Sequence, residues 1–301
     1  MTKAAGDGIF RDDGDVIDAT IGVVGCGFVG GATARFFQRR ARAVVIYDPM
    51  IVGSTLDAVV DVADFIFVAV PTPMRADGSC DISIVEETCR LIAERAHAVG
   101  RLDQFIVVIK STVPPGTTDS LREATNLRIV FSPEFLTERN ADNDFANPSR
   151  IIVGGDGIDI DDVEDFFLDA FGLRDIMGMF FRMTAHEAEL VKLASNAFLM
   201  TKVIFFNEIE RLCDALGAEF NVVRAGVVAD QRIGGSHSRV PGPDGHRGVG
   251  GHCFPKDMGD LIDVFARVGV AQRVLTAVRD RNLEVRDDRD WERMVGRAVV
   301  G

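Results

Sequence analysis

A glycine-rich turn between a strand and a helix restricts the fold of this chain more than any other stretch. The run TIGVVGCGFVGGATARFFQRR reads as a short β-branched strand, a turn, and a helix with small residues facing the strand. Gly25, Gly27 and Gly30 form GxGxxG, which binds dinucleotides when a strand precedes it and a helix follows. The pyrophosphate would lie on the helix N-terminus, beside Phe28 and Val29. An ordinary tight turn is the alternative interpretation.

A second predicted strand, AVVIYDP, ends in Asp48, 21 residues after Gly27. A carboxylate at about this spacing binds the adenosine ribose of a dinucleotide. It would also repel the 2′-phosphate of NADP, so Asp48 favours NAD as the cofactor.

Strands and helices go on alternating through DFIFVAV, DISIVEETCRLIAERAHAV, QFIVVIKST and NLRIVFSP. This alternation is typical of a Rossmann-like α/β fold with a doubly wound parallel sheet. Ligands of such sheets bind beyond the carboxyl ends of the strands, where VPTP and KSTVPPGTT follow two of them. Thr72, Ser111 and Thr112 are therefore predicted to line the cofactor cleft, although proline-rich turn chemistry explains these segments equally well.

Two glutamates follow the strand NLRIVFSP, in the segment SPEFLTERNA. Glu134 and Glu138 are four residues apart and would face the same way on a helix. Acids at this spacing usually form a solvated helix surface, but these two also fall at the carboxyl end of a strand.

Length and charge limit the class of protein. The chain has 301 residues, 47% of them hydrophobic, which is enough for a large core and two domains. We expect a mobile leader over 1–19, the Rossmann-like domain over 20–181 and a mainly helical domain over 182–301. The net charge of -13 argues against a nucleic-acid partner, and no apolar run is long enough for a membrane span. Five cysteines without a CxxC pair indicate no metal site and favour a reducing cytoplasm.

The segment 186–216 is apolar nearly all round, which is typical of a central helix buried inside the chain or in an oligomer. Lys192 and Asn196 are four residues apart and project from one face of it, and Asn207 returns to nearly the same direction. A lysine buried without an ionic partner is costly. Lys192 is therefore expected either to pair with a carboxylate or to serve a ligand.

A loop rich in glycine and proline, SHSRVPGPDGHRGVGG, comes after this helix. Arg232 stands just before the loop, and Arg239 and Arg247 lie within it. Arginines there suit an anionic substrate, although arginines on loops are more often simply solvated.

The stretch GVGGHCFPKD, from Gly248 to Asp257, holds the strongest candidate for catalysis. Its glycines let the backbone approach a ligand closely, and Pro255 suits the first turn of a helix. Cys253 would then lie at the positive end of that helix with Lys256 beside it, which favours the thiolate that a nucleophile needs. A small buried hydrophobe near a glycine turn is the alternative for a lone cysteine.

These stretches together resemble the UDP-glucose/GDP-mannose dehydrogenase family, from about Ile21 to about Asn282. They are GVVGCGFVG, VAVPTP, KSTVPPGTT, SPEFLTE, NPSRIIVGG, KLASNAF with the NE that follows it, and GVGGHCFPKD. The resemblance implies an enzyme that uses NAD twice to oxidise the C6 alcohol of a nucleotide-linked hexose to a carboxylate. The KD after FP resembles the branch that acts on ordinary hexoses and not on N-acetylmannosamine. NAFLMTK and NPSR resemble the UDP-glucose enzymes more than the GDP-mannose ones.

The resemblance also implies roles for single residues. Cys253 resembles the nucleophile that captures the aldehyde as a thiohemiacetal and is later acylated. Lys192 and Asn196 resemble the pair that stabilises negative charge on the C6 oxygen, as buried cationic and amide donors do. Asp257 resembles the carboxylate beside that lysine and an ordered water, and Glu134 the acid–base group that hydrolyses the thioester.

Other positions resemble contacts of the cofactor or of the substrate. Thr72 and Glu138 resemble cofactor contacts, and Thr112 the hydroxyl that holds the water and the nicotinamide side. Arg232 resembles an arginine lent across a dimer interface to the substrate. The matching stretches add three further substrate contacts, Phe135, Leu136 and Gly250.

The chain departs from the family after Cys253. Only 48 residues follow it, whereas the family continues into a second α/β domain that holds the nucleotide, so we expect that domain to be lacking. Two other interpretations stay open: a hydroxyacid dehydrogenase with a similar Lys/Asn pair and no use for a cysteine, and a non-catalytic NAD-binding partner of a full-length dehydrogenase. We expect a homodimer through 186–216, since its apolar surface would otherwise face water.

Overall fold

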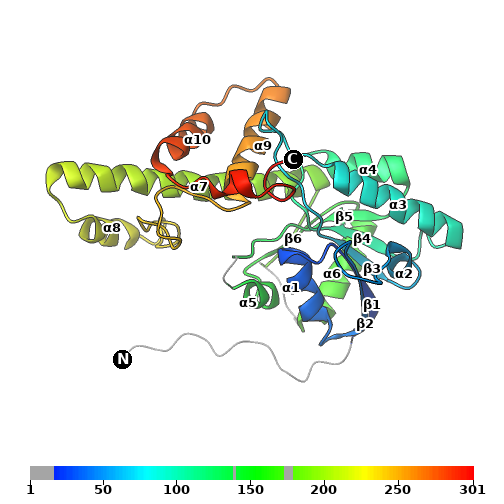
Figure 1. Ribbon diagram of the computed structural model, residues 1–301. Helices are drawn as coiled ribbons and strands as arrows, with labels where there is room; N and C mark the ends of the chain where they lie inside the picture. The colour runs from blue at the N-terminus through cyan, green and yellow to red at the C-terminus, as the bar shows by residue number, and fades with distance from the viewer. Residues whose placement is uncertain (1–16, 138–139, 173–178) are drawn as a thin grey trace, which may run out of the picture. The chain divides into compact units, whose positions relative to one another are not determined.

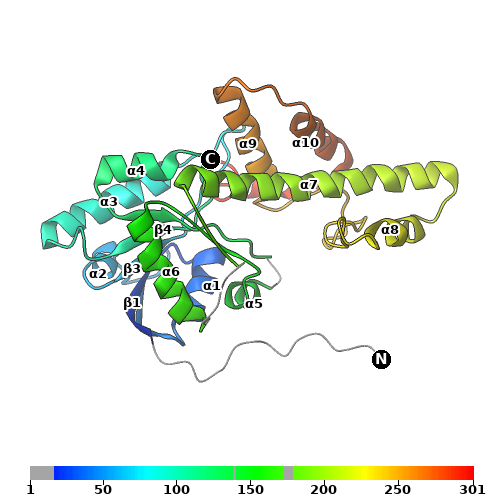
Figure 2. The same ribbon diagram turned by 180° about the vertical axis from the view of Figure 1, so that it is seen from behind.

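A computed structural model describes residues 17–137, 140–172 and 179–301. By their contacts, these residues form two compact units (Figures 1 and 2). The first unit holds the described residues up to 70, with 84–111 and 115–189, and the second holds 71–83, 112–114 and 190–301.

The first unit is built on a seven-stranded sheet in the order β2-β1-β3-β4-β5-β6-β7. Its strands are β1 (Ile17–Val24), β2 (Ala41–Tyr47), β3 (Phe65–Val68), β4 (Ile106–Ile109), β5 (Ile129–Phe131), β6 (Ile151–Gly154) and β7 (Phe180–Met183). The strands from β2 to β5 pair in parallel, which confirms the predicted fold class. β6 pairs antiparallel with β5 and parallel with β7. The sequence did not predict this reversal.

Helices cover both faces of the sheet. They are α1 (Phe28–Phe37), α2 (Leu56–Val60), α3 (Ser83–Val99), α4 (Thr117–Thr125), α5 (Ala141–Ala146) and α6 (Gly157–Phe171). α1, α5 and α6 share one core with the strands, in which the Phe37 ring centroid lies 5.3 Å from those of Phe67 and Phe166. α2 packs on the other face, where Val59 meets the backbone of Gly22. α3 and α4 lie side by side in both views (Figures 1 and 2).

The first strand begins earlier than predicted. β1 starts at Ile17, so residues 17–19 belong to the sheet and not to the leader expected over 1–19. Burial explains the difference, because the side chains of Ile17 and Ala19 both enter the core. Residues 1–16 lie outside the described residues.

Two glycines make the turn between β1 and α1 possible. Gly25 has φ +86°, a conformation that L side chains rarely adopt. A Cβ on Gly30 would lie 1.8 Å from the carbonyl oxygen of Gly25. Only glycine at residue 30 therefore allows the first turn of α1 to pack this closely against the strand.

The second unit is helical. It holds most of α7 (Ala185–Leu216), together with α8 (Phe220–Val228), α9 (Phe254–Arg267), α10 (Val274–Val285) and a short 3-10 helix, η1 (Asp290–Arg293). Its main core joins α7, α9 and α10 through Leu193, Met200, Ile204, Met258, Leu261 and Val278. In the part of the chain that the structure describes, no helix combines the length and the apolar character that crossing a membrane requires.

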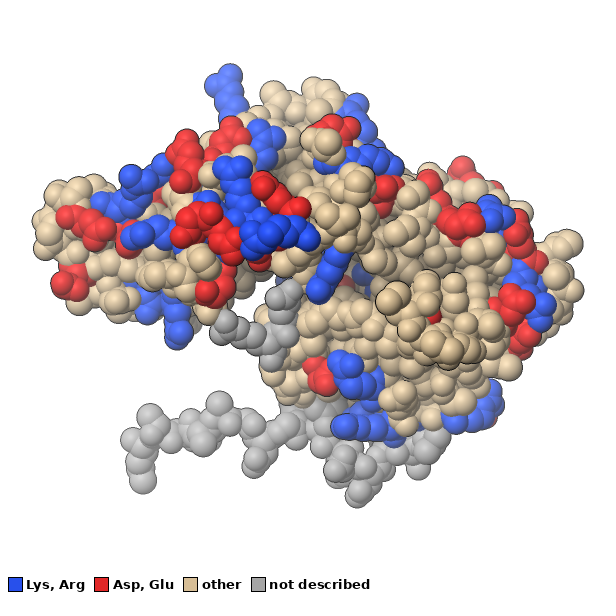
Figure 3. All heavy atoms as spheres, viewed as in Figure 1, with Lys and Arg blue, Asp and Glu red and all other residues tan. Residues whose placement is uncertain are grey.

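One side of α7 is apolar and exposed in the single chain. Phe198, Phe205 and Leu212 follow one another at seven-residue spacing, with 67%, 51% and 53% of their surfaces exposed. Leu190 and Leu216 extend this stripe toward the two ends of the helix. Elsewhere on the second unit, the face seen in Figure 3 mixes basic and acidic side chains closely. The α7 stripe differs from this mixed charged surface in having its exposed apolar side chains in a row along one helix.

The turn between β1 and α1 generates a stability prediction. Gly30→Ala should lower the free energy of unfolding by at least about 2 kcal/mol, because its Cβ would press on backbone and the turn must shift. Gly226→Ala on α8 is the matched control, since its Cβ would meet nothing within 4 Å and its φ is not positive. Urea unfolding of both variants measures the difference. Equal losses would show that the close approach at residue 30 does not matter.

Candidate active site

The glycine turn offers a phosphate-sized site at the start of α1. No side chain of the described residues caps this helix, and its first turn holds no acidic residue. The positive end of the helix dipole can therefore attract an anion. Such an end, approached closely through Gly25 and Gly30, fits the pyrophosphate of a dinucleotide.

Asp48 connects the turn to the end of β2. Its Oδ2 accepts a hydrogen bond from the backbone N–H of Cys26 at 2.7 Å, and its Oδ1 accepts one from Met50 at 2.9 Å. A carboxylate has about four acceptor positions, so capacity is left for a ribose hydroxyl. The position of this carboxylate suits a ribose ligand. The role of Asp48 in binding the ribose stays a prediction.

The loops after β3 and β4 are tied together. The Ser111 hydroxyl is buried and donates to the carbonyl oxygen of Val70 at 2.7 Å. In the second unit, the Cys80 thiol lies 3.8 Å from the carbonyl oxygens of both Thr72 and Thr112. The structure therefore brings Thr72 and Thr112 together around a buried cysteine, while Ser111 belongs to the first unit.

Glu134 lies in a loop and not on a helix. Residues 132–137, which follow β5, have no helical turn, so the helical spacing considered for Glu134 and Glu138 is not formed. Glu138 lies outside the described residues. Glu134 forms an ion pair with Lys110, whose side chain is buried at the end of β4 and also donates to Ser132 Oγ at 3.2 Å.

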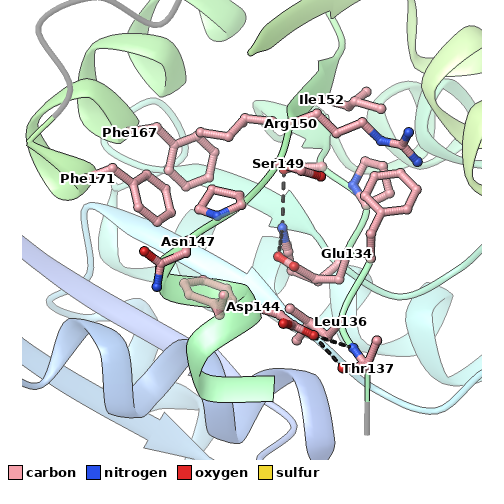
Figure 4. A pocket seen from close by; sticks show the side chains of 17 residues that line it. Glu134, Leu136, Thr137, Asp144, Asn147, Ser149, Arg150, Ile152, Phe167 and Phe171 are labelled. Carbon is pink, nitrogen blue, oxygen red and sulfur yellow. Dashed lines mark hydrogen bonds and ion pairs between the residues drawn. The ribbon is translucent and has the colours of Figure 1, made fainter. Parts of the chain in front are cut away.

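A cavity of about 280 Å³ opens beside this ion pair in the first unit. Glu134, Phe135 and Leu136 all line it, and its far wall carries Phe167 and Phe171 from α6 (Figure 4). The Arg150 guanidinium stands 3.9 Å from the centroid of the Phe135 ring. Three candidate substrate residues thus share one partly polar cavity. Sequence reasoning missed Lys110. A lysine directly after the apolar strand IVVI could have indicated a buried charge there.

The glycine loop before Cys253 is held by buried amides. Asn207 Oδ1 accepts a hydrogen bond from the backbone N–H of Gly248 at 3.1 Å. Asn282 on α10 accepts one from the N–H of Val249 at 2.7 Å and donates to its carbonyl oxygen at 3.1 Å. Asn207, one of the polar residues on the apolar helix, therefore fixes the loop that carries Cys253.

Gly250 is enclosed by side chains of the C-terminal segment. A Cβ there would lie 2.2 Å from Asp290 Oδ1 and 2.3 Å from Arg286 Nη2. Asp290 also accepts a hydrogen bond from the N–H of Gly251 at 3.1 Å, and the buried Arg286 pairs with Asp244 at 2.6 Å. Packing on this side explains the glycine at residue 250. The contact of Gly250 with a substrate stays a prediction.

Cys253 is the N-cap residue of α9, and a proline follows in the first turn, as predicted. Its side chain is half-buried. No side chain of the described residues caps the helix at this point, so the helix dipole acts on the cysteine directly. The location suits a thiolate nucleophile.

A buried polar group stands one turn further along α9. Asn196 Nδ2 donates to Asp257 Oδ2 at 2.6 Å, and Lys256 Nζ lies 2.6 Å from Asp257 Oδ1. Burial lowers the pKa of Lys256, but neighbouring groups, the Asp257 carboxylate first among them, together hold that pKa above its usual range. Lys192 is half-buried, four residues before Asn196 on α7. The ion pair of Lys256 with Asp257 was not foreseen from the sequence, and the role expected of Lys192 beside Asp257 stays a prediction.

Asp260 extends this group into the core. It is fully buried, and neither carboxylate oxygen has a hydrogen-bond partner among the described residues. Burial raises the pKa of Asp260 to about 7, against the opposing charge of Lys256. Sequence reasoning missed Asp260. The signal was its spacing of seven residues from Cys253, which places both on one face of a helix.

Arg232 stays apart from this cluster. The side chain is 88% exposed, and its guanidinium pairs with Asp230 at 2.6 Å. Within a single chain it therefore forms part of the surface. Its role toward a substrate held by another chain stays a prediction.

Glu189 is a second buried carboxylate that sequence reasoning missed. It accepts hydrogen bonds from the backbone N–H groups of Gly116 and Thr118 at 2.6 and 2.8 Å, and from the Thr118 hydroxyl at 2.6 Å. These bonds cap the N-terminus of α4, directly after the loop KSTVPPG. Burial raises the pKa of Glu189 even though the three hydrogen bonds oppose the rise. Glu189 is a structural anchor for that loop.

Comparison with known proteins finds one family over two successive parts of the chain. Residues 49–163 match the NAD binding domain of the UDP-glucose/GDP-mannose dehydrogenase family, and residues 186–284 match the central domain of the same family. A UDP-glucose 6-dehydrogenase of Rhizobium meliloti is 37% identical over 266 residues, which are 81% of this chain and 54% of that protein. One of Pseudomonas aeruginosa is 34% identical, over 86% of this chain and 64% of that protein. The chain thus spans roughly half to two thirds of these curated relatives.

A solved structure extends the likeness to three dimensions. A UDP-glucose dehydrogenase from Pyrobaculum islandicum superposes with a TM-score of 0.77 at 31% sequence identity. The match covers 92% of this chain and 70% of that one.

Asp260 generates a prediction about stability and pH. Its pKa is higher in the folded chain than the ordinary value of 3.8, so the folded chain keeps a proton that the unfolded chain releases between about pH 4 and pH 7. The free energy of unfolding should therefore fall as the pH rises through this window, by up to about 4 kcal/mol. In Asp260→Asn this fall should be absent. Asp263→Asn, three residues on and paired with Arg267, is the control that should keep it. Urea unfolding at pH 5 and pH 8 measures both, and equal pH dependence in wild type and Asp260→Asn would contradict the prediction.

Proposed function

The chain belongs to the UDP-glucose/GDP-mannose dehydrogenase family, and on that basis we propose that it oxidises the C6 alcohol of UDP-glucose to a carboxylate, using NAD twice and Cys253 as nucleophile. The observation that carries the proposal is the position of Cys253. It caps α9 one turn from the buried group of Asn196, Asp257 and Lys256. A structural cysteine would not need a positive helix end on one side and a buried ion pair on the other.

NAD, which the family's N-terminal domain binds, supplies the hydride acceptor for both oxidations. The uncapped N-terminus of α1 would hold its pyrophosphate, and Asp48 its adenosine ribose. Ser111, Thr72, Thr112 and Glu138 are proposed as further contacts. A carboxylate at residue 48 favours NAD over NADP, whose 2′-phosphate would be repelled.

In the first oxidation the C6 hydroxyl loses a proton and a hydride and becomes an aldehyde. Negative charge grows on the C6 oxygen, and the Lys192 ammonium and the Asn196 amide are proposed to stabilise it. One N–H of the Asn196 amide is held by Asp257, which fixes the direction of the other. Such preset donors stabilise the transition state more than the neutral alcohol.

In the second oxidation Cys253 takes part covalently. Its thiolate adds to C6 and gives a thiohemiacetal, which keeps the aldehyde bound. Loss of a second hydride gives a thioester, and water then releases the carboxylate and restores the thiol. Glu134 is proposed as the acid–base group of this hydrolysis, with Thr112 and Asp257 holding the water. In total one alcohol, one water and two NAD⁺ give one carboxylate, two NADH and three protons.

The sugar nucleotide is proposed to contact Phe135 and Leu136, which line the cavity beside Glu134, and the backbone at Gly250. Arg232 is exposed enough to reach a substrate held by a second copy of the chain. The relatives named above as UDP-glucose 6-dehydrogenases support UDP-glucose over other sugar nucleotides.

The stoichiometry of the reaction tests the proposal. The purified chain with saturating NAD should form two NADH per UDP-glucose consumed. Cys253→Ala should lower full turnover at least about 100-fold, because the thioester cannot form. Cys89→Ala removes a buried cysteine of α3 and should keep full turnover.

Three outcomes would overturn the proposal. Full four-electron turnover by Cys253→Ala would remove the nucleophile. Oxidation of a small hydroxyacid, with no response to UDP-glucose, would favour the hydroxyacid dehydrogenase. NAD binding without any turnover would favour a non-catalytic partner of a full-length dehydrogenase.

We further propose that two copies of the chain pair through the α7 stripe. Apolar side chains at positions 190, 198, 205, 212 and 216 form one side of a 32-residue helix, and a second copy of the same stripe would cover them. Phe198→Ser combined with Phe205→Ser should therefore turn a dimer into a monomer in sedimentation at micromolar concentration. Ile158→Ser removes an equally exposed side chain on α6 and should leave the dimer intact. A wild-type monomer would contradict this pairing.

A further inference from the structure

Three ionisable side chains share one face of α9 with the candidate nucleophile. Lys256, Asp257 and Asp260 follow Cys253 by three, four and seven residues, the spacing of neighbours along one side of an α-helix. Lys256, Asp257 and Asp260 are all buried. The face is therefore a continuous polar strip from the N-cap into the core of the second unit.

The strip carries one cation for two carboxylates. Lys256 pairs with Asp257, and the pair is neutral as a whole. Asp260 is the third member, and both of its oxygens lack a hydrogen-bond partner among the described residues. A buried carboxyl without partners costs stability, and its charge is not balanced locally when it ionises. The net charge of the strip therefore depends on whether Asp260 is protonated.

The surroundings of Asp260 contain few other charges. On α9 itself they are Lys256, Asp257, Asp263 and Arg267, and the last two form a pair with each other at 2.8 Å. From the segment 71–83, Cys80 faces the same region, and burial raises the pKa of its thiol to about 12, so it stays uncharged. Asp260 itself changes charge near pH 7.

We propose that Asp260 is a positioning residue: by gaining or losing a proton it sets the net charge around Lys256, and thereby how readily Cys253 becomes a thiolate. When Asp260 is neutral, the Lys256 ammonium is balanced by Asp257 alone. When Asp260 is ionised, the strip carries one excess negative charge two helical turns from the cysteine. That charge opposes a second negative charge on the sulfur.

The size of the effect follows from the distance. Seven residues of helix rise about 10 Å. At that separation, with screening typical of a protein, one charge changes the thiolate equilibrium by roughly three- to tenfold. This inference rests on the proposed role of Cys253 as a nucleophile, but it does not depend on which sugar is oxidised.

The test measures the cysteine directly and uses neither NAD nor sugar. Iodoacetamide alkylation of Cys253 is followed by mass spectrometry of its peptide from pH 5 to pH 10, in the full chain. In the wild type, the pH of half-maximal rate should lie roughly half to one unit above that of Asp260→Asn. Asp260→Ala should behave like Asp260→Asn, because both remove the charge. Asp263→Asn should behave like the wild type.

Equal half-maximal pH values in wild type and Asp260→Asn would overturn the proposal. If neither Asp260 variant folds, the wild-type curve decides alone. It should be broader than the titration of a single proton, and a single-proton curve would count against Asp260. Because the alkylation needs no turnover, a chain that fails to oxidise UDP-glucose would disprove the proposed function and leave this test standing.

Discussion

The buried ion pair of Lys256 and Asp257 is the interaction on which the polar interior of the second unit depends. Its two charges lie in the first turn of α9, where the core would otherwise be apolar. Removing a buried ion from such a pair leaves the other uncompensated, which costs more than the pair contributes. Asn196 uses the second oxygen of Asp257, so α7 is fixed to α9 by the same carboxylate. The cysteine at the helix N-cap is therefore set beside a rigid charged group.

The first unit repeats this arrangement at the end of its sheet. Lys110 ends β4 inside the core, and Glu134 after β5 supplies the compensating charge. Each unit thus holds one buried lysine matched to a carboxylate that we assign to chemistry. Neutral pairs of this kind let polar groups stay in a low-dielectric interior, where their fields are strongest. Other polar contacts, such as those of Asn207 and Asn282 with the glycine loop, hold the backbone in place and involve no charged group.

Features of the sequence that act locally were predicted well. The turn at Gly25 to Gly30, the alternation of strands and helices, and Cys253 at a helix start all follow from neighbouring residues. Lys110, Glu189 and Asp260 were missed because their partners, or their lack of partners, depend on contacts between distant segments. The reversal of β6 has the same origin, since periodicity gives the existence of a strand but not its direction. The ion pair of Lys256 with Asp257 was not foreseen either, and the role of Lys192 beside Asp257 stays a prediction.

Neither unit is a continuous piece of the chain. The segments 71–83 and 112–114 leave the sheet half and belong to the helical half, so the chain passes from one unit to the other five times. No single cut can release either unit whole, and no single junction can transplant one onto another protein. Because their segments alternate along the chain, the two units are always made as one polypeptide. The boundary between the two units therefore does not lie at any one position of the sequence.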